Sequence, residues 1–178
     1  ENLIPAFHRF TRQARLDLSD LPEYAVVNTD FNQGERFTQL GELEYPKKRW
    51  QELTKKRLSH LGLLRRVDLT ASGLRHLAYY SSEPRLYHGM MFCRPGLEQS
   101  DGRNLSLWLY SSLKLLQMLV SRIPSRGGWT EYHRNTVAKF YVPDPLAIEE
   151  SEERDLRRTF EEVGNVEFPS IAEQMIQN

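Results

Sequence analysis

The histidine and cysteine side chains are the first candidates for chemistry, and their spacing argues against metal binding and nucleophilic catalysis. The five histidines are scattered, with no pair four residues apart and no cysteine or carboxylate at the spacing of a zinc site. The single cysteine, Cys93, ends the apolar run "GMMFC", which predicts a buried, unreactive thiol. The sequence contains no Gly-rich phosphate loop, no G-x-S-x-G motif and no dinucleotide fingerprint. We therefore expect no catalytic residue and no metal ligand in this chain.

A second kind of chemistry is indicated by the stretch "SRGGWTEYHRNTVAKFYVPDP", residues 125–145. Two adjacent glycines permit backbone conformations that other residues avoid, and the arginine and aromatic side chains around them supply donors and flat surfaces of the kind that contact bases and phosphates. The alternative is a structural turn in which Trp129 and Tyr132 cap the neighbouring helix. The candidate DNA-contacting residues of this stretch are Arg126, Trp129, Tyr132 and Arg134.

Charge is unevenly distributed along a chain whose formal net charge is zero. Residues 47–142 hold 17 basic and six acidic residues, whereas residues 143–178 hold three basic and ten acidic ones. A basic segment of this kind can meet phosphates, or the acidic ends of the chain can fold over it and neutralise it. The candidate phosphate contacts are Lys48, Arg49, Lys55 and Lys56 on one side of an expected helix, and Arg65 and Arg66 after its end.

Helices and short strands must position these residues. Pro46 and Gly62 bound a segment with helical apolar spacing, which predicts a helix. A second helix is expected over residues 105–123, with wide apolar coverage that places Trp108, Leu109 and Leu116 in the core. A third begins at the acidic stretch around Ser151 and stops at Gly164, before a short last helix in "PSIAEQMIQ".

Strands are expected where β-like runs alternate with turn residues. One is Tyr24 to Asn28, and two more, His76 to Ser81 and Leu86 to Cys93, flank Ser82-Glu83-Pro84-Arg85 in the pattern of a hairpin. Together the elements predict an α+β fold: a single mixed domain with a central, largely buried helix, short strands and an acidic C-terminal helix.

The length of 178 residues suits one domain, in which we distinguish a loop-rich acidic opening (1–46), a basic recognition body (47–142) and acidic C-terminal helices (143–178). Because the sequence opens without methionine, we expect a C-terminal fragment of a larger protein. A single cysteine and the lack of a signal-peptide pattern favour a cytoplasmic setting. Lys114 and Gln117 interrupt the longest apolar stretch, which argues against a membrane span.

One segment, "RLSHLGLLRRVDLTASGLRHL" (residues 57–77), resembles the end of a winged-helix domain. There a helix runs into a Gly-Leu-Leu-Arg corner, and a later Leu-Thr-x-x-Gly begins another helix. The segment lacks the residues for a normal wing hairpin between Arg66 and Leu69. A winged-helix DNA-binding module is therefore an alternative, as is a protein-interaction domain that binds no nucleic acid.

A longer segment, "LSLWLYSSLKLLQMLVSRIPSRGGWTEYHRNTVAKFYVPDP", resembles the C-terminal target-recognition region of adenine-specific DNA methyltransferases of restriction-modification and related defence systems. The shared phrases are a helix with small residues, a Gly-containing turn, a short element and an apolar run closing in a "vPdP"-like phrase before an acidic helix. The resemblance covers roughly residues 86–163. It implies that the chain recognises double-stranded DNA and packs against the catalytic domain of its parent protein.

The chain departs from those enzymes in lacking both the Gly-rich methyl-donor motif and the Asn-Pro-Pro-Tyr-like catalytic motif. Chemistry on a flipped base requires that pocket. We therefore expect no cofactor in this fragment, with S-adenosylmethionine bound by the parent protein.

Overall fold

The computed structural model describes residues 3–7, 13–26, 56–87, 90–93, 98–121, 123–124 and 129–176, and these form an α+β fold, as expected. The elements are short, and two separate sheets hold all the named strands of the described residues. The strands are β1 Leu3–Phe7, β2 Tyr24–Val26, β3 Ser59–Leu64, β4 Arg66–Asp68, β5 Ala78–Tyr87, β6 Met90–Phe92, β7 Ile123–Pro124 and β8 Trp129–Glu131. The helices are α3 Gln99–Tyr110, α4 Ser112–Val120, α5 Arg134–Val137, the 3₁₀ helix Pro145–Ala147, α6 Glu150–Val163 and α7 Ile171–Ile176.

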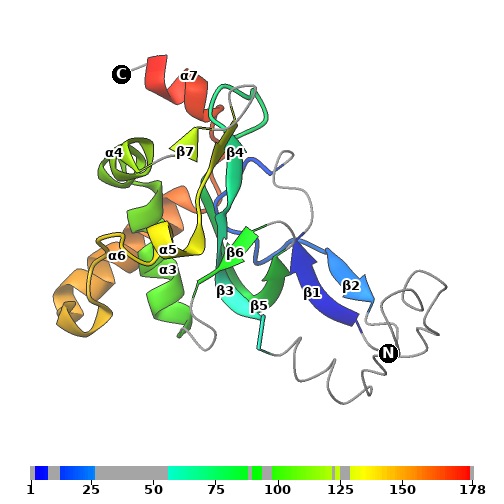
Figure 1. Cartoon of the computed structure of the whole chain (residues 1–178). Coiled ribbons are helices and arrows are strands. Elements are labelled where there is room, and N and C mark those ends of the chain that lie inside the picture. The colour runs from blue at the N-terminus through cyan, green and yellow to red at the C-terminus, as the bar shows by residue number, and fades with distance from the viewer. Residues whose placement is uncertain are drawn as a thin grey trace.

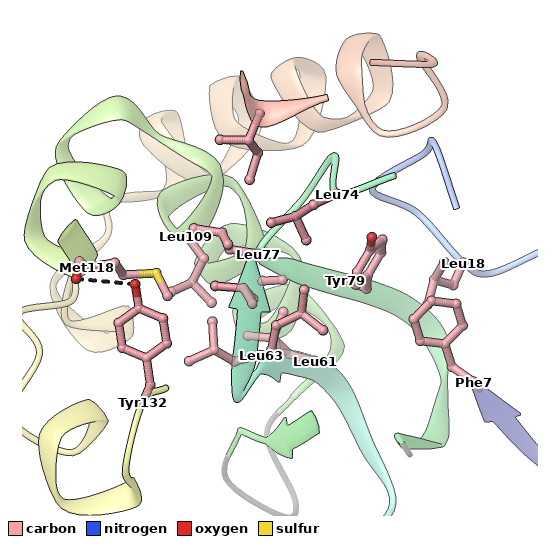
Figure 2. Packing of buried hydrophobic residues seen from close by; sticks show 14 residues of the cluster. Phe7, Leu18, Leu61, Leu63, Leu74, Leu77, Tyr79, Leu109, Met118 and Tyr132 are labelled. Atoms are coloured by element: carbon pink, nitrogen blue, oxygen red, sulfur yellow. Dashed lines mark hydrogen bonds between the residues drawn. The ribbon is translucent and has the colours of Figure 1, made fainter. Parts of the chain in front are cut away.

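The larger sheet has five strands in the order β2-β1-β5-β3-β6, in which only the β1–β5 pair is parallel. Helix α3 packs on β3 and β5, and α6 packs on α3, so that these helices gather on one side while β1 and β2 lie at the opposite end (Figure 1). The core lies between α3 and the sheet, where Leu61, Leu63, Tyr79 and Leu109 come together (Figure 2).

The prediction of a helix ending at Gly62 is wrong over residues 59–64, which form β3; residues 46–55 of that helix lie outside the described residues. β3 is a central strand between β5 and β6, and its residues Leu61, Leu63 and Leu64 are all buried. Periodicity alone cannot distinguish a short buried strand from a buried helix. Gly62 is required here for space: a Cβ atom would lie 2.4 Å from the Tyr87 ring.

The winged-helix interpretation fails at the same place. It needs a helix that runs into Gly62–Arg65 and another that begins near Leu69. Residues 59–64 instead form β3, which includes Gly62 to Leu64, and turns and irregular segments occupy residues 69–77.

The expected hairpin is also absent, because Ser82 to Arg85 lie inside the single strand β5 and β6 pairs with β3 instead. Between two register points, β5 advances from Tyr80 to Arg85 while β3 moves only from Leu61 to Ser59. The extra residues form a bulge, a place where a strand tolerates a proline such as Pro84. A pattern that looks like a turn is therefore an irregularity within one strand.

Arg85 fixes this bulge although its side chain is almost fully buried. Its guanidinium donates to the Ser81 hydroxyl at 2.8 Å and to the main-chain oxygens of Ser19 at 3.2 Å and Glu23 at 3.3 Å, with a longer contact of 3.5 Å to the Ala6 oxygen. The side chain thus ties β5 to β1 and to residues 19–23.

The long helix expected over residues 105–123 is two helices, α3 and α4, that meet at Ser111. Ser111 has an extended backbone (φ −65°, ψ 152°), and its hydroxyl accepts a hydrogen bond from the Lys114 N–H, so it caps α4. The break turns α4 so that Lys114 and Met118 face inward while Leu116 is 58% exposed. Leu109 lies in the core as expected, Trp108 is half-buried, and the placement of Leu116 in the core is wrong.

Three other predicted elements are confirmed. Strand β2 covers Tyr24–Val26, and α7 covers Ile171–Ile176. Helix α6 begins at Glu150, where the Glu149 N–H donates to the Glu152 carboxylate at 2.9 Å, and ends at Gly164. Its buried Phe160 packs on Tyr80 of β5.

Residues 14–18 lie between β5 and the segment that follows α6. On one side they exchange main-chain hydrogen bonds with Tyr80. On the other, the Asp17 N–H donates to the Gly164 oxygen at 2.9 Å, and the Phe168 N–H donates to the Ala14 oxygen at 3.1 Å. An early segment of the chain is therefore enclosed by a late one. Within the described part of the chain, no helix has the length and apolarity needed to cross a membrane.

Candidate nucleic-acid interface

The smaller sheet, in the order β4-β8-β7, brings together residues that are far apart in the sequence. In its register Val67 faces Thr130, and both are buried. Because side chains alternate along a strand, the neighbouring pairs Arg66–Glu131 and Asp68–Trp129 lie on the opposite, outer face. We call the exposed group formed by Arg65, Arg66, Trp129 and Glu131 the β4–β8 face.

Two arginines on the β4–β8 face have different partners. The Arg65 guanidinium forms an ion pair with the Glu131 carboxylate at 3.0 Å, with both side chains partly exposed. The Arg66 guanidinium lies over the Trp129 ring, 5.1 Å from its centre. Trp129 is 38% exposed, so an edge of this cation and ring pair remains open to a ligand.

The charge of this outer face is mixed. Asp68 accepts hydrogen bonds from the Thr70 hydroxyl and N–H, which lower the pKa of its carboxyl. Since Glu131 is paired with Arg65, both carboxylates are engaged, and within the described residues Arg66 has no acidic partner. The available chemistry is that of a flat cation held on an indole ring, which suits stacking on a base or contact with a phosphate.

The prediction that Tyr132 contacts DNA is wrong, because its side chain is fully buried. Its hydroxyl donates to the main-chain oxygen of Met118 at 3.2 Å (Figure 2), and its ring packs edge-on against Phe140. Met118 lies in the last turn of α4, where carbonyls lack helical partners. Tyr132 therefore caps the neighbouring helix, as the alternative structural interpretation predicted for it.

The remaining candidate contacts are dispersed. Arg134 is exposed at the start of α5, shortly after β8, and Lys56 is exposed in a turn before β3. The sheet brings Arg65, Arg66 and Trp129 together. The other candidates, Lys48, Arg49, Lys55 and Arg126, lie outside the described residues.

Lys114 is a buried lysine that the sequence analysis does not select as a candidate. Its side chain is fully buried in α4, its ammonium donates to the Gln117 side-chain oxygen at 2.9 Å, and it lies 3.7 Å from the centre of the Phe140 ring. Burial lowers its pKa to about 8. A lysine inside an otherwise apolar helical stretch was the available signal, and it had been used only to argue against a membrane span.

The Cys93 thiol is protonated at neutral pH, because burial raises its pKa to about 12. No group of three or more His, Cys, Asp or Glu side chains is placed to hold a metal ion in the part of the chain that the structure describes.

At a significant level, the chain matches no protein-family model, no curated protein and no solved structure.

Proposed function

We propose that the protein is a DNA-recognition module that contacts double-stranded DNA through the β4–β8 face. The observation that carries the proposal is the Arg66 guanidinium stacked on the exposed Trp129 ring, without an acidic partner within the described residues. A guanidinium held flat on an aromatic ring keeps its outward donors free and loses little side-chain freedom when it binds.

Two features place other cations near this contact. Arg134 follows β8 by three residues, and Arg65 precedes Arg66, although Glu131 neutralises part of its charge. In this proposal Arg66 and Arg134 meet phosphates or base edges, and Lys56, with Lys48, Arg49 and Lys55 of the basic segment, sets the protein on the duplex. Arg126, which the sequence analysis selects in the Gly-containing stretch, is the candidate for reading a base.

We further propose that the module serves an adenine-specific DNA methyltransferase in the cytoplasm. The support is the sequence resemblance described above. The catalytic domain of the parent would then bind S-adenosylmethionine, and this chain would supply target recognition.

A duplex-binding titration at several salt concentrations tests the DNA proposal. Arg66→Gln should weaken binding and flatten the dependence of affinity on salt by roughly one unit if one phosphate contact is lost. Arg157→Gln, on the outer side of α6 where the side chain is 64% exposed, is the matched control and should change neither quantity. Unchanged affinity and slope in Arg66→Gln, with folding intact, would exclude this face.

A specific observation favours a second candidate function, docking onto a protein. Leu113, Leu116 and Val120 lie on one side of α4 and are 58% to 85% exposed. An apolar stripe of this kind suits a protein interface, and we assign it to the catalytic domain of the parent protein. Replacing Leu113 and Val120 by serine should weaken that association with little dependence on salt, whereas duplex binding should be unaffected.

A further inference from the structure

An open surface pocket of about 380 Å³ lies between α4 and α5, and its lining includes no residue of the β4–β8 face. Its volume lies in the range of small-ligand sites. Gln117 and Ser121 line it from α4, and Asn135 and Thr136 line it from α5. The segment after α5 completes the wall with Lys139, Phe140 and Tyr141. We call this the α4–α5 pocket.

Lys139 is the charged residue of the α4–α5 pocket, and none of the described residues that line the pocket is acidic. Lys139 is exposed and brings an ammonium group. Gln117 has its side-chain oxygen engaged by Lys114 at 2.9 Å, so the group it can offer to a ligand is its NH₂. Ser121, Asn135 and Thr136 add hydroxyl and amide groups that can donate or accept. A cation without acidic neighbours among the described lining residues suits a ligand with negative charge.

A buried positive charge lies directly behind this wall. The Lys114 ammonium contacts two lining side chains, Gln117 and Phe140, and within the described residues it has no carboxylate partner. A charge removed from water acts over a longer distance than one at the surface. Lys114 therefore adds a positive field to the pocket without being exposed in it.

Tyr141 gives the pocket a flat apolar side. Its side chain is 83% exposed, while its main-chain oxygen accepts a hydrogen bond from the Trp108 indole N–H at 3.1 Å. The backbone is thus held while the ring remains available. An exposed aromatic ring beside cationic and amide donors is the combination on which single bases stack while their phosphates are held.

We propose that the α4–α5 pocket binds one nucleotide unit, with the phosphate at Lys139, the base against Tyr141, and the Gln117 and Asn135 amides at acceptors of the base. The unit has two possible sources, a free nucleotide or a nucleotide exposed in a single strand. This site uses none of the residues assigned to the duplex contact, so it does not depend on that proposal.

The test is an NMR titration of the full chain with each deoxynucleoside 5′-monophosphate, with inorganic phosphate and with a short single-stranded oligonucleotide. Nucleotides should shift the side-chain amides of Gln117 and Asn135. Lys139→Gln and Tyr141→Ser should each weaken binding about five- to tenfold. Lys114→Met should weaken it about twofold or more while leaving the fold intact, since Met fills a similar volume.

Two controls match these variants. Tyr24→Ser removes another exposed tyrosine, and Arg158→Gln removes an exposed cation of α6 that is assigned to no binding site. Neither should change nucleotide binding. An oligonucleotide that binds tenfold more tightly than any mononucleotide assigns the pocket to a strand, and equal affinities assign it to free nucleotides.

The proposal is wrong if no nucleotide shifts the pocket amides at about 10 mM, a concentration that detects even millimolar affinity. It is also wrong if inorganic phosphate binds as tightly as the nucleotides, because stacking on Tyr141 would then contribute nothing. Equal effects of Tyr141→Ser and Tyr24→Ser would likewise overturn it.

Discussion

Two cationic side chains, Arg85 and Lys114, are buried among the residues that the structure describes, and their surroundings differ. Arg85, in the bulge of β5, has its guanidinium surrounded by the Ser81 hydroxyl and by main-chain oxygens from two other segments. Lys114, in α4, has one amide oxygen and the face of Phe140. The first charge is well provided with hydrogen bonds, and the second has one acceptor for three donors.

The difference bears on what each buried charge does for the stability of the fold. A fully hydrogen-bonded buried charge joins the segments that surround it, and removing it leaves their carbonyls without partners. A buried charge with few partners lowers the stability of the fold, and such a cost is commonly found where a residue serves a site. Lys114 lies behind a pocket, whereas Arg85 lies between strands.

The largest expected effect is that of Arg85→Met. The substitution keeps much of the side-chain volume but leaves the Ser19 and Glu23 oxygens without this donor, so it should lower the free energy of unfolding by about 1 to 3 kcal/mol for each oxygen left unpaired. Urea denaturation measures the change. Arg154→Met, in the exposed part of α6, is the control and should change stability by less than about 0.5 kcal/mol. A loss below about 1 kcal/mol for Arg85→Met would contradict its structural role.

His76 is a further buried ionisable group, and unlike Arg85 and Lys114 it is neutral. Its Nε2–H donates to the Ala14 oxygen at 2.9 Å, the rings of Tyr79, Tyr110 and Phe168 surround it, and burial lowers its pKa from 6.5 to about 4. Between these values the unfolded chain binds a proton that the folded chain does not.

Stability should therefore fall as the pH decreases from 6.5 to 4, by about 3 kcal/mol from this residue. His76→Gln retains an N–H donor without titrating, so its unfolding free energy should depend less on pH by that amount. Parallel pH profiles for the two proteins would show that folding does not change the pKa of His76, against this expectation.

Replacing Lys114 by methionine should raise the free energy of unfolding, whereas replacing Arg85 should lower it. Removing the poorly partnered charge should raise the free energy of unfolding at pH 7 by about 1 to 2 kcal/mol. The gain should disappear as the pH rises from 8 towards 10.5, because the folded protein then loses the Lys114 proton while the unfolded chain keeps it.

The neighbouring Cys93 thiol has a pKa of about 12, so it titrates above this range. Lys139→Met at the surface should show neither effect. A clear loss of stability in Lys114→Met would place Lys114 with Arg85 as a structural residue.

The smallest expected effect concerns the two sides of the α3–α4 pair. Leu116→Ala, on the exposed side of α4, should change stability by less than about 0.5 kcal/mol. Leu109→Ala, on the core side of α3, should lower the free energy of unfolding by about 2 to 5 kcal/mol. Equal losses in the two variants would mean that the apolar stripe of α4 is covered.

The fold class could be predicted from the sequence because helical and strand patterns were both present, and the acidic capping residues located α6. The errors came where tertiary contacts override local patterns. The apolar residues of β3 form a strand, and not a helix, because β5 and β6 pair with them. The turn-like residues of β5 are held within the strand by Arg85. Ser111 could have been read as a cap inside the predicted long helix.

The candidate site shows the same division. Sequence selected Arg65, Arg66 and Trp129 from distant segments, and the small sheet brings them together. It did not separate exposed Trp129 from buried Tyr132, because both are aromatic and only the register of β8 decides which side chain faces inward. The role of Lys114 depends on Gln117 and Phe140, and no spacing rule links Phe140 to it.

The enclosure of residues 14–18 between β5 and the segment after α6 has a consequence for synthesis. Their hydrogen bonds to Gly164 and Phe168 join positions about 150 residues apart, so they cannot form until nearly the whole described chain has left the ribosome. Contacts so distant in sequence slow folding and leave apolar surface open to aggregation in the meantime. The core between α3 and the sheet can assemble earlier. The packing of residues 14–18 against the segment after α6 must follow late in synthesis.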